Sequence, residues 1–150
     1  NTQMNTSEEG IALIKKFEGC ELTAYQCSAN VWTLGYGHTK GVREGDECDV
    51  ERAEDMLIND LQEFERWVNE LVKVELLQHQ FDALVAWTFN LGPTNLAEST
   101  MLKRLNVKDY GIVPTEMRRW NRAGGQVVDG LVRRREAEAL LFAGENWEHV

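Results

Sequence analysis

The sequence predicts an α+β fold in which helices dominate over one small sheet. Apolar residues recur at helical spacing through most of the chain. Between residues 22 and 39, by contrast, strand formers such as Tyr25 and Val31 alternate with breakers such as Gly35. The chain has 150 residues, the size of one ordinary domain, and shows no internal repeat or linker. A single domain over residues 1–150, built of two lobes, is therefore expected.

Helix signals follow one another along the chain. Ser7 and the acids after it predict a first helix that ends near Gly19. Asp49 caps a long helix of about six turns, which is suited to joining two lobes. Asp129-Gly130 is interpreted as a turn before the last helix. The other helices are expected over 78–91, which Gly92-Pro93 ends, over 99–105, from Pro114 onward, and over 131–142.

The composition restricts the function classes. The net charge is −9 and the pI about 4.8, which disfavours nucleic-acid binding. No apolar run approaches the roughly 20 residues of a membrane helix, so we expect no membrane insertion. Three cysteines, Cys20, Cys27 and Cys48, make no disulfide framework and suit a reducing compartment. A zinc site from these thiols and His38 is disfavoured, because no Cys-x-x-Cys pair is present.

The N-terminal segment is polar and unlike a signal peptide. Met4 is a candidate start, in which case residues 1–3 are a cloning remnant, and residues 1–6 are expected to be flexible. Synthesis in the cytoplasm follows from this interpretation.

Glu18 is the first candidate for chemistry. It ends an apolar helix face just before a glycine and the predicted sheet, where a carboxyl can lie at the mouth of a cleft between two lobes. Partial burial there would raise its pKa, as a general acid at neutral pH requires. The alternative from composition alone is a solvated glutamate at a helix end.

The residues around Glu18 are similar to a known signature. Glu18 is followed after eight residues by Cys27, after five more by Thr33, and then by Gly-Tyr-Gly-His-Thr. This resembles the phage-type lysozymes, also called phage endolysins, which form a glycoside hydrolase family. Further similarity lies in the segments 80–84, 89–92, 99–102, 119–125 and 130–135, so that the resemblance spans about residues 8 to 143.

The resemblance implies a lysozyme-like fold and roles for three residues. The fold has a β lobe at about 20–48, a helical lobe at about 75–143, and an active site in the cleft between them. Glu18 would protonate the glycosidic oxygen, and Thr33 would position the attacking water. Most family members have Asp where this chain has Cys27, which leaves Cys27 open as a base, a water holder or a nucleophile.

Supporting roles are expected for Gly37, His38, Asn90 and Arg133. For His38 we favour a structural role, in which the ring satisfies backbone or a carboxylate. Arg133 to Arg135 are expected on a solvated helix face, with Arg133 the candidate to reach Glu18, as the resemblance implies. Trp87 and Trp120 are expected in the core.

The expected function is an endolysin that hydrolyses the bond between N-acetylmuramic acid and N-acetylglucosamine in bacterial peptidoglycan. No cofactor or metal is implied. The alternatives are a lytic transglycosylase that uses Glu18 alone and, in another class, a non-catalytic peptidoglycan-binding module. The resemblance further implies a monomer that stays in the host cytoplasm and acts on the cell wall after release through a separate membrane lesion.

Overall fold

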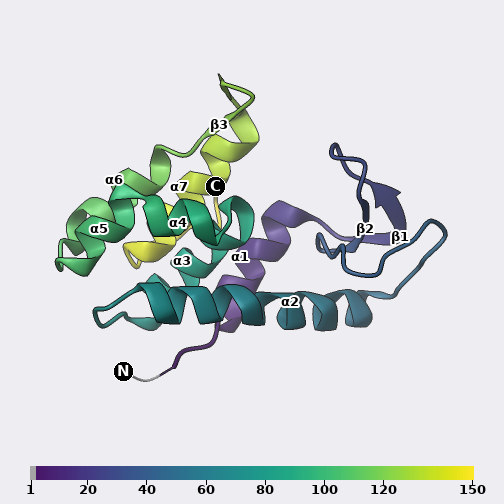
Figure 1. Ribbon diagram of the computed structural model, residues 1–150, viewed down its shortest axis with the longest axis horizontal. Coiled ribbons are helices and arrows are strands. Elements are labelled where there is room, and N and C mark those ends of the chain that lie inside the picture. Colours follow the sequence, from purple (N-terminus) through teal and green to yellow (C-terminus); the bar gives the residue numbers. More distant parts are fainter. Residues whose placement is uncertain (1–2) are drawn as a thin grey trace. The chain divides into compact units, whose positions relative to one another are not determined.

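The computed structural model describes residues 3–150, which fall into two compact units (Figure 1). The first contains the N-terminal segment up to Leu13 and residues 63–150, and the second contains Ile14–Gln62. Residues 1 and 2, part of the segment expected to be flexible, lie outside the described residues. Within the described residues, the Met4 N–H donates a hydrogen bond to Asn69 Oδ1 at 3.0 Å. The expected lobe boundaries, and a cleft between the lobes, stay predictions.

The second unit is built on an antiparallel sheet. β1 (Glu21–Gln26) pairs with β2 (Trp32–Gly35), and a bulge interrupts the pairing in the first half of β1. The end of α1 (Glu8–Glu18) and the first part of α2 (Val50–Leu71) complete the unit. The backbone of Gly35 packs so closely on α2 that an added Cβ would lie 3.1 Å from the Cβ of Ala53. The core of this unit consists of buried apolar side chains, among them Ile14, Leu34, Tyr36, Ala53, Leu57 and Leu61.

The first unit is helical, and its core lies around α3 (Gln78–Leu91), whose residues from Phe81 to Thr88 are all buried. Figure 1 shows the later helices gathered around α3, and both α3 and α6 pack against α7. The remaining elements are α4 (Pro93–Glu98), α5 (Thr100–Asn106), the 3-10 turn η1 (Tyr110–Ile112), α6 (Val113–Arg118), β3 (Arg122–Ala123), β4 (Gln126–Val127) and α7 (Asp129–Phe142).

The α+β prediction is confirmed, with the helix ends where local capping set them. Asp49 caps α2, because its Oδ1 accepts the Arg52 N–H at 2.7 Å. The Ser99 hydroxyl caps α5 by accepting the Leu102 N–H at 3.0 Å. Trp87 is fully buried and meets Trp120 edge to face, with 5.4 Å between ring centroids.

One expectation about turns was wrong. Asp129-Gly130 begins α7 instead of forming a turn, because an aspartate in the first turn of a helix is favoured by the helix dipole. The turn lies earlier, between β3 and β4, where Gly124 and Gly125 have φ of 59° and 78°. The expected end of α3 at Gly92-Pro93 is confirmed, and Pro93 then begins α4, since proline is well tolerated in a first helical turn.

Candidate active site

Glu18 is the last residue of α1, and a glycine makes room for its carboxyl. Gly37, in the loop after β2, has a φ of 82°, a conformation that residues with side chains rarely adopt. A Cβ added to Gly37 would lie 3.0 Å from Glu18 Oε1. Glu18 is only partly exposed. The loop after the sheet therefore approaches the carboxyl of Glu18 closely, and a side chain at position 37 would displace that carboxyl or strain the backbone.

Cys27 lies in the tight connection between β1 and β2, where backbone N–H groups donate hydrogen bonds to its sulfur. Its N–H donates to the Val31 carbonyl at 3.0 Å, and Asn30 within the turn has a φ of 62°. Hydrogen bonds from the backbone N–H groups of Val31 and then Ala29 lower the pKa of the Cys27 thiol below its ordinary value. Such an arrangement of amides stabilises an anion, here the thiolate.

Thr33 lies beside this thiol. Its hydroxyl contacts the Cys27 sulfur and contributes to the lowered pKa of the thiol. The same hydroxyl donates a hydrogen bond to the Val31 carbonyl oxygen at 2.9 Å. Thr33 is buried, with 4% of its surface exposed, while Cys27 is partly exposed. A thiol with a lowered pKa and a buried hydroxyl are therefore presented together at the end of the sheet.

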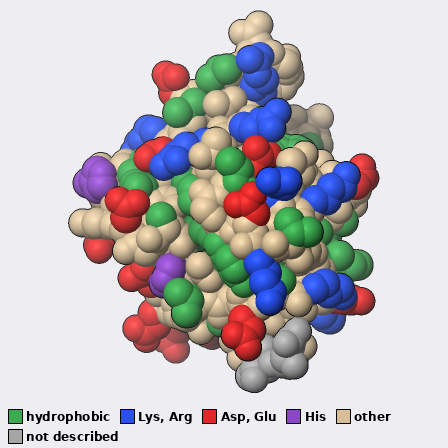
Figure 2. Space-filling view, turned by 90° about the vertical axis from the view of Figure 1, so that its left-hand side faces the viewer, with side chains coloured by type: hydrophobic (Ala, Val, Ile, Leu, Met, Phe, Trp, Pro, Cys, Tyr) green, Lys and Arg blue, Asp and Glu red, His purple; other side chains and the backbone are tan. Residues whose placement is uncertain are grey.

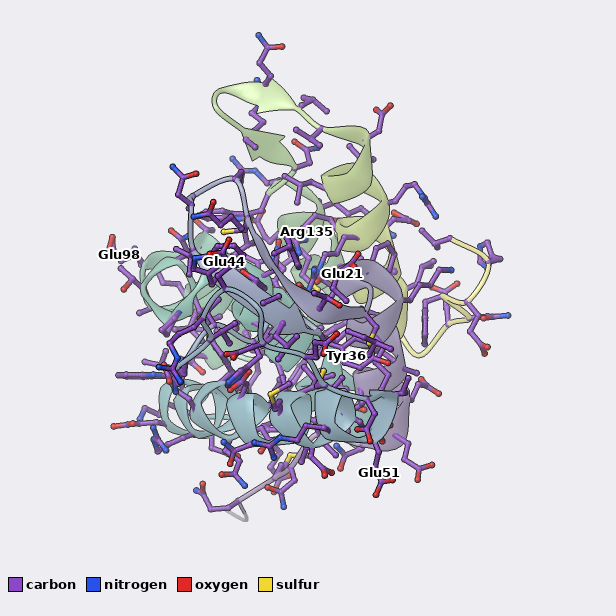
Figure 3. All side chains as sticks on the ribbon, turned by 90° about the vertical axis from the view of Figure 1, so that its right-hand side faces the viewer. Glu21, Tyr36, Glu44, Glu51, Glu98 and Arg135 are labelled. Atoms are coloured by element: carbon purple, nitrogen blue, oxygen red, sulfur yellow. The ribbon has the colours of Figure 1, made fainter. Side chains whose placement is uncertain are left out.

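His38 is held by a carboxylate. Its Nδ1 lies 2.8 Å from Asp60 Oδ2, a residue of α2, and its backbone pairs with Leu34 through two hydrogen bonds of 2.8 and 2.9 Å. An ion pair of Lys15 with Glu54 at 2.7 Å joins α1 to α2 beside the ring of Tyr36. Figure 3 shows the labelled Tyr36 next to α2. These contacts fix the loop that carries Gly37.

Asn90 and Arg133 lie in the first unit. Asn90 is exposed in the last turn of α3. Arg133 is exposed on α7 and donates a hydrogen bond to the Val150 carbonyl oxygen at 3.2 Å. Their participation in the site stays a prediction.

The expectation of a solvated arginine face was wrong for two of the three arginines. Arg134 and Arg135 are buried on α7, with 4% and 0% of their surface exposed. Both pair with the buried Glu138, and the Arg135 Nε donates to Glu138 Oε1 at 2.6 Å. Arg135 also donates to the Trp120 carbonyl oxygen, which ties α7 to the segment after α6. A carboxylate three or four residues further along the helix makes this burial possible.

Sequence reasoning missed the partners of the site residues. Asp60 lies 22 residues from His38, so no local pattern connects them. The backbone amides around Cys27 carry no side-chain signature, although Ser28-Ala29-Asn30 is a recognisable turn signal. The described cysteines are all free thiols, and the described residues contain no group of three His, Cys, Asp or Glu side chains that could hold a metal ion.

Comparisons with known proteins identify the family of the chain. The sequence model of the phage lysozyme family matches residues 15–138. An endolysin of Acyrthosiphon pisum secondary endosymbiont phage 1 is 44% identical over 143 residues, covering 93% of this chain and 98% of that relative. An endolysin of Bacillus phage B103 is 43% identical over 142 residues, covering 93% of this chain, which spans only 54% of that longer relative.

A solved structure supports the fold. The muramidase domain of SpmX from Asticaccaulis excentricus matches with a TM-score of 0.87 at 39% identity, covering 92% of this chain and 97% of that domain. The lysozyme-like fold expected from the sequence is confirmed by this similarity. The family match contains Glu18, Cys27 and Thr33 within its bounds. The chain belongs to the phage lysozyme family.

Proposed function

We propose that this protein is an endolysin that hydrolyses the β-1,4 bond between N-acetylmuramic acid and N-acetylglucosamine in bacterial peptidoglycan. Membership of the phage lysozyme family makes it a glycoside hydrolase of the lysozyme type. The relatives named endolysin and the muramidase neighbour support the substrate. One observation carries the proposed chemistry. The second unit holds the Glu18 carboxyl close to Gly37 and places the Cys27 thiol beside the Thr33 hydroxyl.

In the proposed mechanism, Glu18 is the general acid. A glycosidic oxygen leaves readily only when it is protonated, and Glu18 supplies that proton. Cys27 takes the place of the second carboxylate that glycosidases usually carry. Its lowered pKa favours the thiolate, which accepts a proton from the attacking water. Thr33 orients that water.

Analysis of the products tests this function. Purified peptidoglycan is digested with the protein, and the released fragments are analysed by mass spectrometry. Hydrolysis leaves reducing ends on N-acetylmuramic acid, and reducing ends are the expected product. A digest dominated by 1,6-anhydro ends would contradict hydrolysis.

Such anhydro ends would favour a lytic transglycosylase, the second candidate. Transglycosylases need one glutamate and no second carboxylate, because a hydroxyl of the substrate attacks in place of water. Cys27 at the position of the usual aspartate is the observation that favours this candidate. The Thr33 hydroxyl beside Cys27 favours hydrolysis, since a transglycosylase has no use for a positioned water.

A non-catalytic peptidoglycan-binding module is the candidate from another class. Glu18→Gln separates it from an enzyme, because the amide keeps the shape of the side chain but cannot donate the proton. We expect this variant to fold and to lose at least about a hundred-fold in lysis rate. Lysis by Glu18→Gln within a few-fold of the unmodified protein would remove Glu18 from the mechanism.

The oligomeric state and the cellular location are also proposals. We propose a monomeric, single-domain enzyme that accumulates in the host cytoplasm and reaches the wall through a separate membrane lesion. The relatives named endolysin support a site of action at the cell wall. No helix among the described residues is long and apolar enough to span a membrane. Sedimentation measures the oligomeric state, and fractionation of producing cells before lysis measures the location.

A further inference from the structure

Tyr25 stands directly opposite Thr33 in the sheet of the second unit. Residues opposite each other in an antiparallel pair point to the same face, with Cβ atoms about 4.5–5.5 Å apart. The bulge in β1 ends at Tyr25, and bulges commonly redirect side chains next to active sites. Thr33 is buried on this face, while 40% of the Tyr25 surface is exposed. The Tyr25 side chain therefore reaches solvent from the face that carries Thr33.

The charges around Tyr25 belong to the proposed site. Burial raises the pKa of Tyr25, and the carboxylates of Glu21 and Glu18 and the thiolate of Cys27 raise it further. The candidate acid and the candidate base both lie within electrostatic reach of this one phenol. Its hydroxyl stays protonated at every pH at which lysis is measured, since even an ordinary tyrosine pKa is about 10. Tyr25 is thus a permanent hydrogen-bond donor within electrostatic reach of the candidate acid and the candidate base.

We propose that Tyr25 is a further water-positioning residue, whose hydroxyl donates a hydrogen bond to the attacking water on the face it shares with Thr33 and Cys27. The proposal rests on the hydrolysis proposed above. Tyr25 is an exposed phenol of this sheet, whereas Leu22, the other exposed large apolar residue of the sheet, has no polar group that could bind water.

The hydrogen bonds of the water show why a donor is needed. The one proton of the Thr33 hydroxyl is directed at the Val31 carbonyl or at the Cys27 sulfur, so the Thr33 oxygen is left to accept one hydrogen of the water. The Cys27 thiolate accepts the other. One lone pair of the water must face the anomeric carbon, and the remaining lone pair is free to accept a hydrogen bond from Tyr25. The water is then oriented on three sides with its reactive lone pair toward the sugar.

Protons and electron pairs balance in this step. The water oxygen forms a bond to the anomeric carbon while the bond from that carbon to the glycosidic oxygen breaks. Glu18 gives its proton to the departing oxygen, and Cys27 takes one proton from the water. Thr33 and Tyr25 exchange no proton. Exchange with solvent afterwards returns a proton to Glu18 and removes one from Cys27.

Tyr25→Phe tests the proposal, with Tyr110→Phe as the matched control. Tyr110 is a phenol of the first unit whose hydroxyl donates to the Glu75 carbonyl at 2.7 Å. On soluble peptidoglycan fragments, we expect Tyr25→Phe to lower kcat about ten-fold, the scale of one hydrogen bond, and to change KM less than two-fold. Tyr110→Phe should leave both constants near those of the unmodified protein. Thermal unfolding of each variant shows whether the fold is kept.

A double-mutant cycle with Thr33→Val identifies the shared water. If both side chains hold one water, the second substitution costs much less once the first is made. Additive losses in kcat would overturn the proposal, as would an unchanged kcat in Tyr25→Phe. A raised KM with unchanged kcat would instead assign Tyr25 to sugar binding and also overturn it. If the unmodified protein releases no reducing ends, the proposed hydrolysis fails first, independently of Tyr25.

Discussion

At the scale of single residues, the site depends on what glycine and backbone amides provide. Gly37 has no side chain to collide with the Glu18 carboxyl, and the amides of Val31 and Ala29 lower the pKa of Cys27. Gly37 and these backbone amides are not themselves reactive groups. Both decide whether the reactive groups have the position and the charge that the proposed chemistry needs.

Gly37→Ala tests the close approach to Glu18, with Gly41→Ala as its control. Both glycines have positive φ, 82° and 71°, so both substitutions strain the backbone by about 1–2 kcal/mol. Only the Cβ at position 37 meets the carboxyl, whereas nothing lies within 4 Å of a Cβ at position 41. We expect lysis to fall at least about ten-fold in Gly37→Ala and to stay near normal in Gly41→Ala, measured at matched stability. Equal losses would mean that strain alone matters.

Substitutions of Cys27 test its role as the base. An aspartate is ionised at neutral pH and should preserve or raise the lysis rate, while Cys27→Ala should lower it about ten-fold or more. A base works only when deprotonated, so activity falls as the pH drops through its pKa. The aspartate pKa is ordinarily about 3.9, below that of a thiol, so the acidic limb of the pH profile should move to lower pH in Cys27→Asp.

Lysis rates across pH, in the presence of a reductant, provide the measurement. An active Ala variant beside an inactive Asp variant would place Cys27 outside the catalytic set. The mechanism would then depend on Glu18 and Thr33 alone.

At the scale of elements, α1 carries Glu18 at its end and is anchored at its beginning. Ser7 precedes the helix, and both its N–H and its hydroxyl donate to the carboxylate of the buried Asp82 on α3, the N–H at 2.9 Å. Gln78 donates to the same carboxylate at 2.9 Å. A negative charge at a helix N-terminus is also favoured by the helix dipole.

Asp82→Ala should therefore destabilise the protein. It removes three hydrogen bonds to a buried carboxylate and leaves polar groups without partners, which costs on the order of 2–3 kcal/mol of unfolding free energy. Asp55, exposed on α2, is the control, and Asp55→Ala should change stability by less than about 0.5 kcal/mol. Urea denaturation measures both variants. Equal midpoints for the two would show that the anchor contributes nothing.

Elements were predictable from sequence wherever a local signal decides them. The capping residues Asp49 and Ser99 and the strand formers around Tyr25 act within a few residues, and their elements were predicted correctly. Asp129-Gly130 was misinterpreted because the same two residues suit a turn and a first helical turn equally well.

The candidate site was predictable only as far as its signature. Glu18, Cys27 and Thr33 were assigned by their match to the family signature, and the structure pairs Cys27 with Thr33. The bond from His38 to Asp60 and the burial of Arg135 depend on contacts that folding creates, which no local pattern contains.

At the scale of the whole molecule, the net charge is unevenly placed along the chain. Residues 44–75 contain twelve acidic and three basic side chains. The net charge of this segment is −9, the same as that of the whole chain. The rest of the chain is neutral on balance. Figure 2 shows acidic side chains at its lower left, and both acidic and basic side chains elsewhere on the face. An anionic cell envelope therefore repels the acidic segment over distances that salt controls.

Moderate salt should therefore accelerate lysis. Raising the ionic strength from about 10 mM to about 150 mM shortens the screening length from about 30 Å to about 8 Å, which removes most long-range repulsion between enzyme and wall. The initial lysis rate of purified walls should rise over this range, with the change in apparent KM rather than kcat. Neutralising three exposed acids of α2 with Glu51→Gln, Asp55→Asn and Glu70→Gln should flatten this response. A rate that falls steadily from the lowest salt would mean that a local basic surface, and not the net charge, controls the encounter.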